Sequence, residues 1–103
     1  MTEKALSLLG LCTRAGRLVA GEENCVKAVR AEKARLVVLD GGASANARKA
    51  LSDACAYRSV PLLETGAGQL GPAVGKRGRM AVAVTDEGFA GAILKAAEKE
   101  TTA

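Results

Sequence analysis

Apolar residues recur along the chain at two spacings, and each spacing predicts one kind of secondary structure. In several stretches they recur every three or four residues, which places them on one face of a helix. Glycine is expected to end the first helix at Gly16, and Ser44 or Asn46 can cap the third. Residues 98–103 are expected to fray. The predicted helices cover about Glu3 to Arg14, Gly21 to Ala34, Ser44 to Cys55, Gln69 to Val74 and Asp86 to Ala97.

Short apolar runs lie between these helices and predict strands. They are Leu18 to Ala20, Leu36 to Leu39, Val60 to Leu63 and Ala81 to Val84. The second run is apolar at every position, which is typical of a central strand covered on both faces. Pro61 has no N–H group to offer a neighbouring strand, so it belongs at a strand start or on an edge. Because strands and helices alternate, the sequence predicts an α/β fold, a three-layer α/β/α sandwich with a small mixed sheet of about four strands.

Length and composition narrow the picture further. The chain has 103 residues, which predicts a single domain over residues 1–103, because two separate cores would each bury too little surface. Apolar residues make up 49% of the chain but only Tyr57 and Phe89 are aromatic, so Leu, Val and Ala must build the core. No apolar stretch approaches the roughly 20 residues of a membrane span, and the N-terminus lacks the apolar run of a secretory signal. We therefore expect a cytoplasmic protein with no membrane partner.

The cysteines and the absence of histidine exclude several kinds of chemistry. Cys12, Cys25 and Cys55 share no Cys-x-x-Cys spacing and lie at apolar helical positions, which is typical of small buried hydrophobes. A structural zinc site needs four Cys or His ligands, and the chain contains no histidine. Without histidine, neither a Ser-His nor a Cys-His nucleophile can form. We expect no metal, no cofactor and no catalytic residues, so the protein is not expected to be an enzyme.

The formal charge of +4 is unevenly placed, and one concentration of polar residues begins at Gly21. Glu23, Asn24, Lys27 and Arg30 follow at spacings that we expect to place on one helical face, at the end where backbone N–H groups are unpaired. The carboxylate and the amide could accept hydrogen bonds from guanine, and the two cations could contact phosphates. An ordinary acidic helix start with one i,i+4 ion pair would explain the same residues.

A second concentration is the loop Lys76-Arg77-Gly78-Arg79-Met80, which contains no acidic residue. Together with the helix start at Gly21, it would form two sides of a clamp for a polyanion such as RNA. Arg17, beside the turn at Gly16, is a further candidate cation. Met80 could lie against an unstacked base, but packing into the core at a strand start is the simpler interpretation.

These segments resemble the kink-turn RNA-binding ribosomal-protein family of archaeal and eukaryotic large subunits, and most closely its small bacterial YlxQ-like branch. The resemblance rests on Gly-Glu-Glu at residues 21–23, Leu-Gly-x-x-x-Gly at 70–75 and Val-Ala-Val-Thr-Asp at 82–86, within a match over roughly residues 5–97. The resemblance implies the same fold and binding to a sharply bent internal loop of RNA that contains tandem G·A pairs. The candidate RNA-binding residues are Gly21, Glu22, Glu23, Asn24, Lys27, Arg30, Arg17, Lys76, Arg77, Gly78, Arg79 and Met80.

The chain departs from the family pattern at several positions. Many members have Asn or Lys in place of Glu23 and Glu or Gln in place of Asn24, so the base contacts are not carried over unchanged. Gly41 and Gly42 replace a common acidic pair, and Pro72 replaces a frequent basic residue. The implied partner is a structured RNA, such as a kink-turn in ribosomal RNA or in an mRNA leader. Association with the ribosome and a monomeric state are also expected.

Two other functions are compatible with parts of the sequence. Residues 66–71 match Gly-x-Gly-x-x-Gly after a predicted strand, which is typical of dinucleotide-binding enzymes. The match is weakened by Pro72 and Gly75, which leave about two helical turns where that motif needs a long helix. A ribosome- or transcription-associated protein-interaction module could also use the basic face without reading RNA. An RNA-binding protein of this composition lacks aromatic side chains on which bases could stack. It should therefore recognise the shape of RNA that is already bent or bulged.

Overall fold

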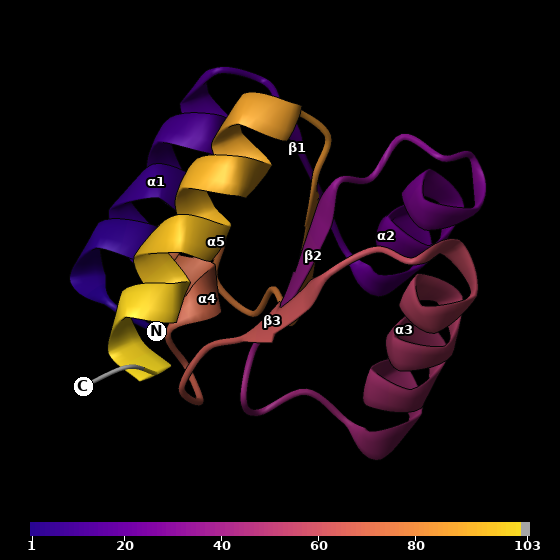
Figure 1. Ribbon diagram of the computed structural model, residues 1–103. Helices are drawn as coiled ribbons and strands as arrows, with labels where there is room; N and C mark the ends of the chain where they lie inside the picture. Colours follow the sequence, from indigo (N-terminus) through magenta and orange to yellow (C-terminus); the bar gives the residue numbers. More distant parts are fainter. Residues whose placement is uncertain (102–103) are drawn as a thin grey trace.

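In the described part of the chain, five helices and four strands alternate, as the periodicity predicts (Figure 1). The computed structural model describes residues 1–101, with side chains through Glu98. The elements are α1 (Glu3–Arg14), β1 (Leu18–Ala20), α2 (Glu22–Arg30), β2 (Leu36–Leu39), α3 (Ala45–Arg58), β3 (Leu62–Glu64), α4 (Leu70–Ala73), β4 (Ala81–Val84) and α5 (Glu87–Thr101).

The four strands form one mixed sheet in the order β1-β4-β2-β3. β2 lies parallel to β3 and antiparallel to β4, and β4 is also antiparallel to β1. The expected central strand is confirmed, since every residue of β2 is buried. Pro61 precedes the edge strand β3, and its carbonyl accepts a hydrogen bond from the N–H of Val37 at 3.0 Å. The residue without a donor therefore takes part in the sheet only as an acceptor.

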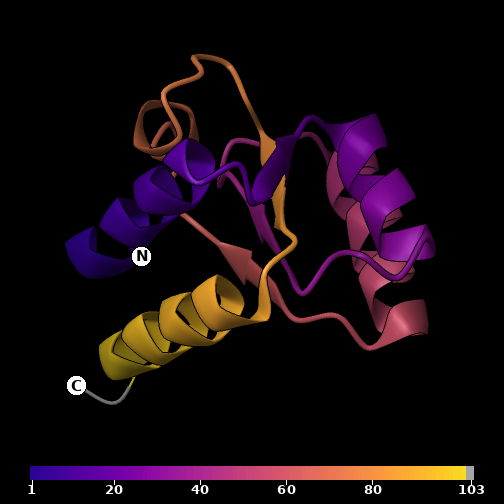
Figure 2. The same cartoon turned by 90° about the horizontal axis from the view of Figure 1, so that it is seen from above.

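Helices cover both faces of the sheet, which confirms the three-layer α/β/α sandwich (Figure 2). Side chains of successive strand residues point to opposite faces, so β2 supplies both cores. Leu36 and Val38 pack with α1, α4 and α5, whereas Val37 and Leu39 pack with α2 and α3. Among the described residues, no helix has the length and hydropathy needed to cross a bilayer.

Side chains cap three of the helices. The hydroxyls of Thr2 and Ser44 accept from backbone N–H groups in the first turns of α1 and α3, and Asp86 accepts from the N–H of Phe89 in α5. The second helix ends at Arg30, before its predicted end at Ala34. The prediction that the chain frays from residue 98 is wrong up to Thr101, where α5 ends. Residues 102 and 103, which the same prediction included, lie outside the described part of the chain.

All three cysteines are buried free thiols, as their apolar positions predict. Burial, with the nearby carboxylate of Asp86, raises the pKa of the Cys12 thiol to about 11. Burial, with the neighbouring Cys55, raises the pKa of the Cys25 thiol to about 12. The thiolate is the reactive form, so these thiols should be inert in the folded protein at neutral pH.

The thiols should become reactive only when the protein unfolds. At pH 8 the native protein should react very slowly with a thiol reagent such as Ellman's reagent, and the urea-unfolded protein should release three equivalents at once. Because the folded pKa values exceed the usual 9.0, the free energy of unfolding should fall as the pH rises through 9. Rapid release of one equivalent by the native protein at pH 8 would contradict this packing.

Candidate nucleic-acid interface

The two polar segments meet at one end of the sheet, although more than forty residues separate them in sequence. Strand β4 runs antiparallel to β1 and β2, so the start of β4 lies beside the ends of both. The N–H of Gly21 donates to the carbonyl of Ala81 at 2.9 Å, and the N–H of Asp40 donates to that of Met80 at 2.8 Å. These two bonds place the start of α2 next to the loop that enters β4.

Gly21 is the point of closest approach between the two segments. Its φ of 102° and ψ of 144° belong to a region that residues with side chains rarely adopt. A Cβ atom placed here would lie 3.3 Å from Nη1 of Arg79 and 3.8 Å from Nδ2 of Asn24. The Arg79 guanidinium therefore lies over the first turn of α2, beside the Asn24 amide.

The side chain of Asn24 turns toward the sheet rather than along its helix. Its Nδ2 donates to the carbonyl of Ala20 at 3.0 Å, which leaves the amide oxygen as an acceptor. Glu23, Lys27 and Arg30 instead line a shallow hollow of about 350 Å³ on the outer side of α2. The prediction that all four share one face is thus wrong for Asn24, which belongs to the side facing Arg79.

The i,i+4 ion pair that the alternative, purely structural explanation of these residues includes is not formed by Glu23 and Lys27. Glu23 and Lys27 are both exposed, and no contact within 4.0 Å joins them among the described ion pairs, which link other residues. Lys27 therefore keeps its charge without a carboxylate partner, as a phosphate contact would require.

The cationic loop is held against the start of β4 by α4. The N–H of Lys76 donates to the carbonyl of Gly71 at 2.9 Å, and the N–H of Arg79 donates to that of Lys76 at 3.3 Å, which closes a turn through Gly78. All residues of this turn are exposed. Met80 is 40% exposed, so its expected packing in the core is wrong: it precedes the strand and lies on the surface.

A buried carboxylate beneath the loop is the residue that sequence reasoning missed. Asp40 follows β2 and is 1% exposed. Its oxygens accept from the N–H groups of Gly42, Gly68 and Leu70 at 2.8, 2.9 and 3.0 Å, and from the Thr65 hydroxyl at 3.3 Å. Burial alone would raise the pKa of Asp40, but these hydrogen bonds outweigh it and hold the pKa below 3.8.

The structure does not bring Arg17 to this interface. Arg17 precedes β1 at the opposite end of the sheet, where its carbonyl accepts from the N–H of Thr85 at 2.9 Å. Four residue steps along an extended chain separate it from Gly21, a distance of about 13 Å. The remaining charged candidates, five cations and two carboxylates, are all exposed. They are Lys27, Arg30, Lys76, Arg77 and Arg79, with Glu22 and Glu23.

Two other sequence interpretations are settled by the geometry. The stretch 66–71 leads into α4, which is only four residues long, so it lacks the helix that a dinucleotide site requires. One aromatic platform is exposed, contrary to expectation, because the Tyr57 side chain on α3 is 79% exposed. Nothing in the spacing of α3 distinguished it, since the residue falls near the end of the helix. Within the described residues, no cluster of three potential metal ligands occurs.

Comparison with known proteins supports one relationship. The family model for the ribosomal protein L7Ae/L30e/S12e/Gadd45 family matches residues 3–94. RNA-binding protein YlxQ of Bacillus subtilis is 42% identical over 88 residues, covering 84% of this chain and 88% of the relative. The protein of the same name from Enterococcus faecium is 37% identical over 89 residues, covering 85% of each chain.

Solved structures share the fold. A Bacillus halodurans protein of unknown function superposes with a TM-score of 0.87 at 39% identity, covering 91% of this chain and 96% of that one. The 15.5 kD RNA-binding protein of Giardia lamblia superposes with a TM-score of 0.76 at 18% identity, covering 96% of this chain and 89% of its own. The second likeness concerns the fold alone.

Replacing Gly21 with alanine should destabilise the protein. The backbone conformation there is strained for any residue with a Cβ atom, and Arg79 would have to move, so we expect a loss of about 1–3 kcal/mol in the free energy of unfolding. The matched control is Gly91→Ala in α5, where a Cβ atom meets nothing within 4 Å. That variant should gain about 0.5–1 kcal/mol. Equal effects in urea unfolding would contradict the assigned role of Gly21.

Replacing Asp40 with asparagine should cost about 2–3 kcal/mol at pH 7, because an amide cannot accept all the bonds that the carboxylate accepts. The folded pKa is depressed, so the carboxylate's contribution is complete above pH 3.8 and is lost as the pH falls through the folded value. The difference in the free energy of unfolding between wild type and variant should therefore narrow in urea unfolding as the pH falls below about 3.8. The exposed Asp53→Asn should change stability by less than about 0.5 kcal/mol.

Proposed function

We propose that this chain, which belongs to the ribosomal protein L7Ae/L30e/S12e/Gadd45 family, binds structured RNA and has no enzymatic activity. One observation carries the proposal: the Arg79 guanidinium lies over Gly21 and beside Asn24, which makes one basic surface out of two distant segments. The names of its Bacillus subtilis and Enterococcus faecium relatives support RNA as the ligand. The RNA that it binds is ribosomal RNA or an mRNA leader. The protein acts in the cytoplasm as a monomer, either free or associated with the ribosome.

The preferred RNA is one that is sharply bent, of the kink-turn type. A regular RNA duplex hides its base edges in a deep, narrow groove, so a rigid helix end can reach them only where the duplex is distorted. The start of α2 is rigid because Asn24 is tied to Ala20 and Gly21 is tied to Ala81. A preformed surface of this kind selects RNA that already has the matching shape.

The residues divide into those that read bases and those that hold phosphates. The Asn24 amide oxygen and the Glu23 carboxylate are acceptors at the start of α2, suited to guanine N–H groups exposed by sheared G·A pairs. Arg79 lies at the same end of the helix and, with the exposed Lys76 and Arg77 of its loop, would neutralise phosphates across the bend. Base reading thus belongs to α2, and sequence-independent affinity belongs to the loop.

The shape preference can be measured with two RNAs. We expect a kink-turn RNA to bind at least about tenfold more tightly than the same RNA without its G·A pairs, because the loss of bidentate base contacts costs roughly 1–3 kcal/mol. Gel-shift titrations at two salt concentrations test this, since phosphate contacts weaken with salt for both RNAs alike. Equal affinity for both RNAs would leave a basic surface without shape recognition and would overturn the kink-turn assignment.

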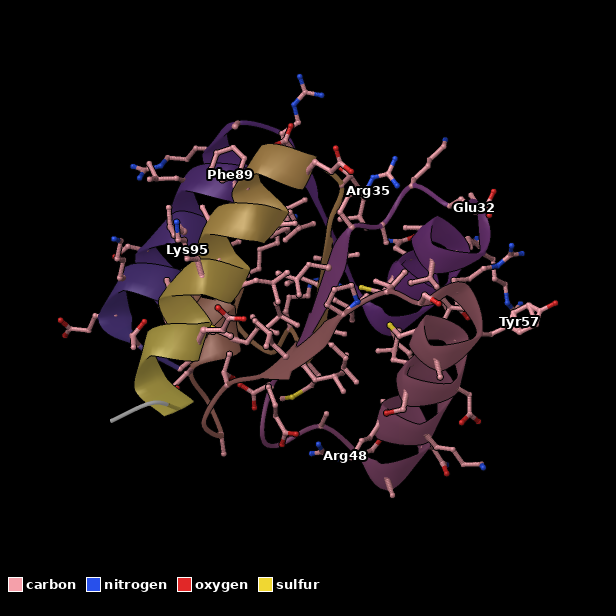
Figure 3. All side chains as sticks on the ribbon, in the orientation of Figure 1. Glu32, Arg35, Arg48, Tyr57, Phe89 and Lys95 are labelled. Atoms are coloured by element: carbon pink, nitrogen blue, oxygen red, sulfur yellow. The ribbon has the colours of Figure 1, made fainter. Side chains whose placement is uncertain are left out.

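Two variants separate the assigned roles. Arg79→Gln should lower the affinity for both RNAs by a similar factor, since it removes one phosphate contact. It should also reduce the slope of log K against log salt by about 1. Asn24→Ala should reduce the preference for the kinked RNA at an unchanged salt slope. Lys95→Gln is the matched control, because Lys95 is exposed on α5 in the opposite layer (Figure 3). An identical salt slope for Arg79→Gln and Lys95→Gln would remove Arg79 from the interface.

A further inference from the structure

A second hollow of about 520 Å³ lies between α2 and α3, next to the surface described above, with which it shares Arg30. Val26 and Ala54 are half-buried and contribute apolar lining, and Arg30, Tyr57 and Arg58 contribute aromatic and cationic groups. It is thus a concave site with an apolar interior and a few charged groups, the usual composition of a ligand-binding hollow.

Tyr57 is unusually exposed for an aromatic residue. Its side chain is 79% exposed and projects from the end of α3 away from the body of the molecule (Figure 3). The guanidinium carbon of Arg58 lies 5.3 Å from the centre of the ring, which is cation–π distance. Arg58 can cover only one face of the ring, and the exposed Tyr57 side chain keeps the other face open.

The hollow is continuous with the candidate RNA interface. Val26 and Arg30 line both this hollow and the shallower one that Glu23 and Lys27 share on α2. Six residue steps along the helix separate Asn24 from Arg30, about 9 Å. A strand of RNA that leaves the start of α2 along this side of the helix would therefore reach the hollow within about three nucleotides.

The charges of the hollow favour a phosphate at Arg30. The carboxylate of Asp53 is paired with Lys49 at 3.7 Å, and Arg58 is paired with Glu32 at 3.3 Å. Arg30 has no carboxylate within 4.0 Å among the described residues. The cation nearest the RNA interface is thus the one whose charge is not neutralised within the protein.

We propose that the hollow between α2 and α3 binds an unpaired nucleotide flanking the folded RNA, with its base stacked on Tyr57 and its phosphate on Arg30. The inference rests on the proposed RNA binding and extends it to a second site. Base stacking on an aromatic ring is tolerant of sequence, so this site would lengthen the footprint without adding base specificity.

The ring itself provides the measurement. The chain has one tyrosine and no tryptophan, so its intrinsic fluorescence reports on Tyr57 alone. A kink-turn RNA with a single-stranded extension of about three nucleotides should quench this fluorescence, and the same RNA with blunt ends should not. Free N-acetyltyrosinamide titrated with both RNAs corrects for absorption of light by the RNA.

Variants distinguish stacking from a purely structural role. Tyr57→Ala should lower the affinity for the extended RNA by roughly tenfold, because stacking one base is worth about that factor. Its affinity for the blunt-ended RNA should stay unchanged. Tyr57→Phe retains the ring and should bind the extended RNA like wild type. Arg30→Gln should remove most of the salt dependence that the extension adds.

The same measurements distinguish a failure of the proposed RNA binding from a failure of the proposed stacking site. If neither RNA binds, the proposed function fails. If both bind with equal affinity and Tyr57 is not quenched, RNA binding stands and this inference is overturned, leaving the hollow to a different partner such as a protein. If Tyr57→Ala no longer binds the blunt-ended RNA, the inference is also overturned, because the ring would then support the fold or the main interface.

Discussion

The buried carboxylate of Asp40 is the interaction on which the functional end of this protein depends. It accepts hydrogen bonds from the turn that follows β2, from the segment that follows β3 and from the first N–H of α4, while the backbone N–H of Asp40 donates to the carbonyl of Met80, just before β4. A buried charge is costly unless every lone pair is satisfied, and here three backbone donors and the hydroxyl of Thr65 satisfy it. The side chain of Asp40 thereby joins the end of β2 to α4 and to the segment that follows β3, and its backbone N–H joins them to the residue that precedes β4.

The surroundings of Asp40 explain why Gly41 departs from the acidic pattern of the family. A Cβ atom at Gly41 would lie 2.7 Å from the carbonyl oxygen of Thr65 and 2.8 Å from the N–H nitrogen of Ala67. No side chain fits there without moving the segment that donates to Asp40. This turn therefore serves packing, and the RNA contacts that we propose belong to α2 and the loop before β4.

The molecule combines a rigid core with a polar surface that follows one helix. Small side chains let α2 and α3 pack closely on one sheet face, while α2 presents different chemistry on each of its exposed sides. Asn24 faces the loop and Arg79, Lys27 faces solvent, and Arg30 reaches the hollow shared with α3. The RNA contacts that we propose along α2 would therefore combine a base-reading helix start, a basic flank and an aromatic platform.

The sequence alone determined the elements, the central position of β2, the two-sided covering of the sheet and the burial of the cysteines, because these follow from periodicity, which is local. Tertiary structure decided which residues meet. It brought Arg79 to Gly21, removed Arg17 to the far end of β1, turned Asn24 away from Lys27, and left Met80 and Tyr57 exposed. It also gave Asp40 its partners. These outcomes depend on the pairing of β4 with β1 and β2, a contact between distant segments that no local pattern records.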